Sequence, residues 1–268
     1  MNPVIPGILA SVLYLLGASL QLASLRQKMP SRRAWVIGSG VAAVTVHAWF
    51  SWQDIFTSSG IDMGLMPMAS LTSLAIAAII TASSFRRPVE NLAIVLFPMA
   101  AICIVLSLAL PDAYTPRSRV PVGIAMHIVL SVIAYSILTI AAFQAMLLSF
   151  GDYELKHHKL AVLKSLPPLL TMEWLLFELL WAGLLFLSLS ISTGFYFMAR
   201  NEGAIPGLVH HTLITLAAWM VFAVLLWGRY QRGWRGATAS RWTLAGFVLL
   251  VVGYFGSKFV LEIVLGRA

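Results

Sequence analysis

The fold class of this chain follows from one segment, Pro121-Val-Gly-Ile-Ala-Met-His-Ile-Val-Leu-Ser-Val-Ile-Ala-Tyr-Ser-Ile-Leu-Thr-Ile-Ala-Ala-Phe143. A run of this length and composition is typical of a helix that crosses the hydrocarbon core of a bilayer, which takes about 20 residues. The run contains one imidazole, His127. Because polar ionisable groups are costly at membrane depth, His127 is a candidate functional residue.

The whole chain has the composition of a membrane protein. Hydrophobic residues make up 60% of it and charged residues 10%, whereas globular proteins carry about 25% charged residues. Apolar runs of membrane-spanning length predict eight helices, at roughly 4–25, 34–53, 64–83, 91–110, 122–148, 172–199, 207–228 and 241–264. We therefore predict an all-α, polytopic membrane helical bundle in which residues 1–268 form a single integral-membrane domain.

Lysine and arginine residues indicate the orientation of these helices. Most of the 18 basic residues lie in alternate connections, namely 26–33, 86–87, 156–164 and 229–241. The positive-inside rule places these connections in the cytoplasm, so both termini should face outward. The net charge of +8 is spread over short loops, which favours the lipid bilayer as the partner and argues against nucleic acid.

The remaining histidines fall at one depth in this topology. His47 lies near the outer end of the second helix, about 9 Å below the surface; His127 lies near the start of the fifth; His210 and His211 open the seventh. Histidines from three helices at one level suit axial ligation of a heme iron. Separate interfacial histidines, satisfied by water or backbone carbonyls, are the alternative. Zinc is less favoured, since no Cys or acidic cluster accompanies them.

The carboxylates of a heme would need positive partners. Arg117 and Arg119 directly precede the His127 helix, and Lys258 lies in the eighth helix. Each is a candidate partner for a propionate, although Lys258 could instead pair with Glu262 four residues on. The single cysteine, Cys103, lies in an apolar run, so the chain has no Cys-x-x-Cys-His attachment site and any heme should be b-type.

Other ionisable residues are assigned away from this site. His157 and His158 lie in the polar sequence Asp152-Tyr-Glu-Leu-Lys-His-His-Lys, which we interpret as part of a solvated cytoplasmic connection. Glu173 and Glu178 lie near the cytoplasmic end of the sixth helix, where they are interpreted as structural or as part of a cytoplasmic gate.

The stretch Met126-His-Ile-Val-Leu-Ser-Val-Ile-Ala-Tyr135 resembles the histidine-bearing helix of the cytochrome c assembly superfamily, the CcsA- and CcmC-like membrane heme handlers. Further stretches resemble its YpjD branch: 166–169, 186–194, 217–219, 233–236 and 254–257. The resemblance implies heme held at the outer face by external histidines, with His127 at the position of the first. The family's tryptophan-rich motif is absent, because residues 201–211 contain no tryptophan.

These observations predict a non-enzymatic heme-handling protein of the bacterial inner membrane. It would hold b-type heme, transiently, through His127 with His47, His210 or His211, and serve apocytochrome c or another membrane protein. The alternative is a heme-free regulatory or scaffolding subunit that supports a membrane enzyme or transporter. An independent transporter is less favoured, since the sequence shows neither paired broken helices nor an inverted repeat.

Overall fold

A computed structural model of the chain describes residues 3–26, 33–110, 116, 118, 120–157, 166–200 and 206–260, with side chains for all of these except 198–200 and 206–210. Eight helices in these ranges are long and apolar enough to cross a membrane. The only strands among the described residues form a short antiparallel hairpin, β1 (Phe56–Thr57) and β2 (Gly60–Ile61). The prediction of an all-α, polytopic membrane bundle is therefore confirmed. Its orientation in the membrane stays a prediction.

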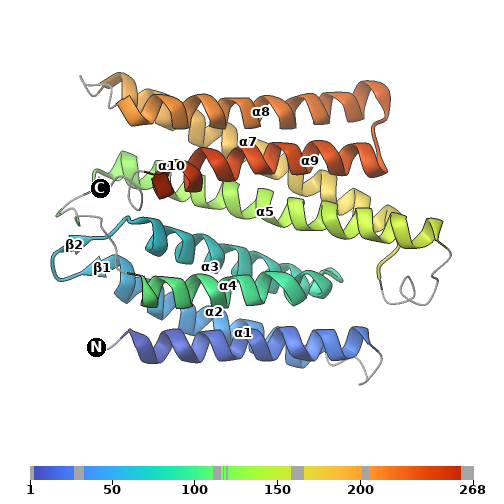
Figure 1. Cartoon of the computed structure of the whole chain (residues 1–268), viewed down its shortest axis with the longest axis horizontal. Helices are drawn as coiled ribbons and strands as arrows, with labels where there is room; N and C mark the ends of the chain where they lie inside the picture. The colour runs from blue at the N-terminus through green and yellow to red at the C-terminus, as the bar shows by residue number, and fades with distance from the viewer. Residues whose placement is uncertain are drawn as a thin grey trace. The chain divides into compact units, whose positions relative to one another are not determined.

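The first of two compact units contains α1 (Val4–Leu25), α2 (Arg33–Ile55), α3 (Leu65–Ser84), the short η1 (Glu90–Leu92) and α4 (Ala93–Ala109) (Figure 1). Small residues set its helix spacing. A Cβ on Gly40 would lie 2.9 Å from Thr81 Oγ1 and 3.0 Å from Phe97 Cζ, so only glycine permits this close approach. The interior of this unit is filled by large apolar rings, of which Tyr14, Phe50 and Phe97 are almost fully buried.

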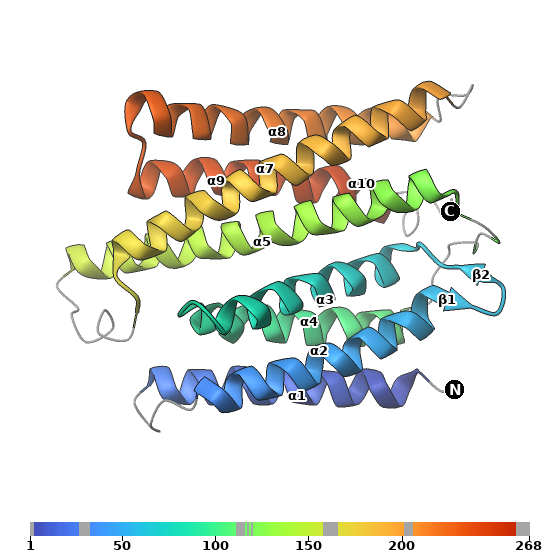
Figure 2. The same cartoon turned by 180° about the vertical axis from the view of Figure 1, so that it is seen from behind.

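The second unit contains α5 (Val122–Lys156), α7 (Leu169–Arg200), α8 (Pro206–Arg232) and α9 (Gly236–Val251), followed by the π-helical η2 (Val252–Gly256). The short α10 (Ser257–Phe259) comes next, and this unit ends within it at Lys258. Figure 2 shows α7 running at an oblique angle to α5. A Cβ on Gly183 would lie 2.5 Å from Leu138 Cδ2, so this glycine allows the crossing. The core between the helices is apolar and contains Leu138, Leu180 and Phe222.

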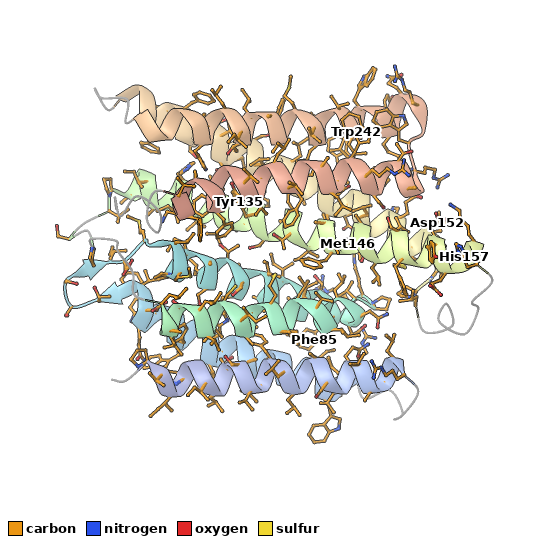
Figure 3. All side chains as sticks on the ribbon, in the orientation of Figure 1. Phe85, Tyr135, Met146, Asp152, His157 and Trp242 are labelled. Atoms are coloured by element: carbon orange, nitrogen blue, oxygen red, sulfur yellow. The ribbon has the colours of Figure 1, made fainter. Side chains whose placement is uncertain are left out.

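The helix α5 extends beyond the predicted end at residue 148 and reaches Lys156. The added turns are polar, and Lys156 Nζ lies 2.7 Å from Asp152 Oδ2 in an i,i+4 ion pair. His157 caps this end, with its Nδ1 2.8 Å from the carbonyl oxygen of Tyr153. Figure 3 shows Asp152 and His157 at the end of α5 and Tyr135 well inside the helix. An apolar run ends where the hydrocarbon ends, whereas hydrogen bonding continues the helix into water.

The same end of the second unit is held by a cluster of ion pairs. Glu173 Oε1 of α7 lies 2.9 Å from Arg229 Nη1 and 2.8 Å from Arg235 Nε. The two arginines flank the turn between α8 and α9, where Gly233 and Gly236 have φ values of +64° and +51°. Glycine adopts such values without a steric penalty. Glu173 therefore connects α7 to the α8–α9 turn, in agreement with its interpretation as a structural residue.

Candidate functional site

A cavity of about 110 Å³ lies at the opposite end of the second unit. It is formed where α5 and α8 begin and where α7 and η2 end, because neighbouring helices of this unit run antiparallel. His127 of α5 and His211 of α8 both line it. The structure thus brings together two of the four predicted heme-ligating histidines.

The hydrogen bonds of His127 fix its tautomer. Its Nδ1 lies 2.9 Å from the carbonyl oxygen of Ser190 and 3.1 Å from Thr193 Oγ1 on α7. A carbonyl oxygen only accepts, so Nδ1 carries the hydrogen and donates it, and Nε2 of the neutral ring carries the lone pair. Metal-ligating histidines commonly donate their other ring N–H to a backbone carbonyl in this way. Nε2 is therefore the His127 nitrogen that could accept a hydrogen bond or bind a metal ion.

The surroundings of His127 hold its ring between two helices. Ser131 Oγ donates to the His127 carbonyl oxygen at 2.8 Å and lies 2.7 Å from Ser190 Oγ. On α7, a Cβ added to Gly194 would lie 3.1 Å from His127 Cε1. Glycine at this position leaves the space that the imidazole occupies, so the ring position depends on α5 and α7 together.

His211 presents the second imidazole. Its Nε2 is buried and has no hydrogen-bond partner among the described residues. The ring stands edge-on to Tyr254 of η2, with centroids 5.9 Å apart. A buried polar nitrogen without a partner costs about 1–3 kcal/mol, and an axial metal ion would satisfy it. This orphaned nitrogen therefore points to a ligand.

His47 lies in the other unit and has a different environment. It is fully buried, with Nδ1 3.1 Å from the Tyr14 hydroxyl oxygen and Nε2 3.0 Å from Ser70 Oγ. Both ring nitrogens are thus occupied by α1 and α3. Ligation by His47 stays a prediction, and it would require one of these two hydrogen bonds to break.

The remaining predicted site residues are only partly described. Arg117 and Arg119 lie outside the described residues, as does the side chain of His210. Lys258 is described, and its Nζ lies 5.9 Å from the ring centroid of Tyr254, so it is next to a residue of the cavity wall. Whether any of the three cations binds a propionate stays a prediction.

The sequence did not identify Ser190, Gly194 and Tyr254 as residues of the cavity, or Thr193 as a partner of His127, although all four lie in the stretches 186–194 and 254–257 that resemble the family. A small residue four positions from another, as in Ser190 and Gly194, marks a helix face that a bulky neighbour can approach. That spacing was visible in the sequence. The sequence did not show that the His127 imidazole of α5 packs against this face of α7, because no sequence rule pairs one helix face with another.

A heme site needs axial donor atoms for the iron and space for the macrocycle. Two imidazoles are a common axial pair for heme iron. No group of three or more His, Cys, Asp or Glu gathers within the described ranges, so a protein-only tetrahedral zinc site is not formed there. The donor set thus fits heme. The cavity of about 110 Å³ is smaller than the 300–1,000 Å³ typical of organic ligand sites.

Comparison with known proteins places the chain in a family. The model of the family described as "Cytochrome C assembly protein" matches residues 35–265. The inner membrane protein YpjD of Escherichia coli K12 is 33% identical over 259 residues, covering 96% of this chain and 98% of the relative. A 28.8 kDa protein of Azospirillum brasilense is 33% identical over 146 residues, covering 54% of each chain. No solved structure matches.

The relative from Escherichia coli and the eight membrane-spanning helices agree on location: this is a multi-pass protein of the inner membrane. The family match extends from α2 to beyond α10 and so includes both units. This agreement over nearly the full length confirms the resemblance found at the His127 helix, and the chain belongs to the cytochrome c assembly protein family.

Proposed function

We propose that this protein binds heme between His127 and His211, near the outer face of the inner membrane, and handles it for cytochrome c assembly without catalysing a reaction. The observation that carries the proposal is the Nδ1–H of His127 donated to the Ser190 carbonyl at 2.9 Å. It leaves Nε2 as the ligating atom in a cavity that His211 also lines, and His211 Nε2 has no hydrogen-bond partner within the described ranges.

In this proposal, heme supplies the iron, and the protein supplies binding and orientation. His127 is held by hydrogen-bond partners on Ser190 and Thr193, whereas the His211 ring stands edge-on to Tyr254 and its Nε2 has no hydrogen-bond partner among the described residues. A firmly held ligand and a less restrained one suit reversible binding, because the second can be released without disturbing the first. The heme is b-type, since Cys103 is the only cysteine and no covalent attachment motif exists.

The proposal extends to the partners and to the rest of the chain. Apocytochrome c or another membrane protein receives the heme, and Arg117, Arg119 or Lys258 binds its propionates. Residues 1–268 act as one integral-membrane domain, which is supported by a family match that includes both compact units.

A visible absorption spectrum tests this function. The full chain, purified in detergent or nanodiscs, is titrated with hemin, and the Soret band of a low-spin bis-imidazole complex is expected. His127→Ala and His211→Ala should each weaken binding and convert the spectrum to a five-coordinate form, whereas His157→Ala at the far end of α5 should leave it unchanged. A spectrum that all three variants share with the wild type would refute the proposal.

A heme-free scaffolding or regulatory role is the second candidate. It is favoured by the absence of tryptophan from residues 201–211 and by the fully hydrogen-bonded state of His47. A double variant, His127→Ala/His211→Ala, distinguishes the two roles in cells. Normal cytochrome c maturation together with unchanged co-purification of a membrane enzyme or transporter would support scaffolding.

A further inference from the structure

One part of the cavity lining comes from an irregular turn. Residues Val252–Gly256 are π-helical, which means that one turn contains an extra residue compared with the α-helix before it. Single π turns inside α-helices occur frequently at functional sites. Tyr254 in this turn lines the cavity, so the irregular backbone lies at the candidate ligand site.

The Tyr254 ring packs against residues of both α5 and α8. Its ring centroid lies 5.4 Å from that of Tyr135 on α5 and 5.9 Å from that of His211 on α8. The cavity beside it measures about 110 Å³, too little for a porphyrin. Tyr254 is the bulky cavity residue that lies in the π-helical turn, so its backbone could instead adopt the regular α-helical conformation.

Contacts of Ser257 and Gly253 support the π turn, and a change to α-helical hydrogen bonding would replace them. Ser257 Oγ donates to the carbonyl oxygens of Gly253 and Tyr254, at 2.5 and 3.0 Å. Gly253 packs against α8, where an added Cβ would lie 3.1 Å from Ile214 Cγ2. Returning the turn to α-helical hydrogen bonding would rotate Tyr254 by about 100° around the helix axis, which takes its ring out of the wall.

We propose that η2 is the gate of the heme site: a π-to-α shift withdraws Tyr254 from between Tyr135 and His211 and opens the cavity to a planar macrocycle. The proposal rests on the proposed heme-handling function for its ligand, but the opening itself is a property of the heme-free chain. It explains how a site too small for heme can nevertheless contain the two imidazoles that heme requires.

A labelling experiment on the heme-free protein tests the gate alone. Leu187 lines the cavity and is fully buried, so Leu187→Cys in a Cys103→Ser background reacts with a maleimide only when the cavity opens. Ser257→Ala removes the hydroxyl that supports the π turn and should increase the labelling rate about fivefold. Ser240→Ala is the matched control, since this α9 serine is buried and its hydroxyl has no hydrogen-bond partner in the part of the chain that the structure describes. Equal rates in the two variants would overturn the gate.

A disulfide tests whether the same movement admits heme. A Cβ on Gly253 would lie 3.5 Å from Ile214 Cβ, within the range of about 3.5–4.5 Å that a disulfide needs. In Ile214→Cys/Gly253→Cys, again with Cys103→Ser, oxidation should slow the appearance of the Soret band at least about tenfold, and dithiothreitol should restore it. The same rate in both redox states would refute the gate. Lack of hemin binding by the wild type would refute the heme function instead, and the labelling experiment would still decide the gate.

Discussion

The Nδ1 atom of His127 lies 2.9 Å from the carbonyl oxygen of Ser190, which joins the first turns of α5 to the last turns of α7. This bond determines both where the imidazole lies and which of its nitrogens can ligate. Because the acceptor is the backbone carbonyl of Ser190, no substitution of the Ser190 side chain removes the bond directly. The predictions about His127 therefore concern the residues around the bond.

The variant Gly194→Ala should weaken hemin binding about tenfold. The new Cβ would lie 3.1 Å from His127 Cε1, and forcing an extra methyl group into a packed contact costs about 1–3 kcal/mol. Hemin titration followed at the Soret band measures the change. Gly38→Ala is the control, because its Cβ would meet no atom within 4 Å. Equal affinities for the two variants would show that the ring does not bind heme in this position.

The variant Thr193→Val should weaken hemin binding about threefold to tenfold. Valine keeps the branched shape but removes an oxygen 3.1 Å from His127 Nδ1, and one hydrogen bond contributes about 0.5–1.5 kcal/mol. The measurement is the same titration, with Thr45→Val as the control, since the Thr45 hydroxyl donates to the carbonyl oxygen of Val41 in its own helix. A loss of protein stability without a change in affinity would assign Thr193 a structural role only.

The variant His47→Leu should destabilise the protein and leave hemin binding intact. It removes the shared partner of the Tyr14 hydroxyl and Ser70 Oγ in a fully buried site, at a cost of about 1–3 kcal/mol. The midpoint of thermal unfolding in detergent should fall, and His47→Gln should recover part of the loss through its amide. A folded His47→Leu protein that no longer binds hemin would instead make His47 an axial ligand.

The variant Glu173→Gln should lower the thermal unfolding midpoint without changing the heme spectrum. It removes the charge that pairs with Arg229 and Arg235, whose side chains are 30% and 56% exposed. Because both arginines reach solvent, the expected cost is about 1–2 kcal/mol and not the larger value of a buried pair. Asp152→Asn, which breaks an exposed i,i+4 pair with Lys156, should cost less than about 0.5 kcal/mol.

The helices could be predicted from the sequence because hydrocarbon thickness imposes a length on apolar runs. The run at 4–25 coincides with α1, and the helix predicted from residue 172 begins three residues earlier, at Leu169, directly after Pro167 and Pro168. The end of α5 was predicted too early, since the last two turns depend on local ion pairs and not on hydropathy. Irregular hydrogen bonding within η2 left no signal in the apolar pattern at all.

The sequence predicted the depth of the site histidines along their helices, but not the directions of their side chains. Counting residues from the helix ends placed His127 and His211 at one level, and the structure brings both to one cavity. The same counting grouped His47 with them, although its ring faces Tyr14 and Ser70. The direction of a side chain depends on how its helix is rotated, and packing contacts such as Gly183 against Leu138 determine that rotation.

The ion pairs of Glu173 also determine how the second unit can deform. They fix α7 to the α8–α9 turn at one end, and Ser190 lies about 25 Å further along α7 at 1.5 Å per residue. Because one end of α7 is fixed and the helix is long, a rotation of α7 by about 5° about Glu173 displaces the backbone at Ser190 by about 2 Å. A tilt this small would shift the carbonyl partner of His127 while the ion pairs of Glu173 near the other end of α7 stay formed.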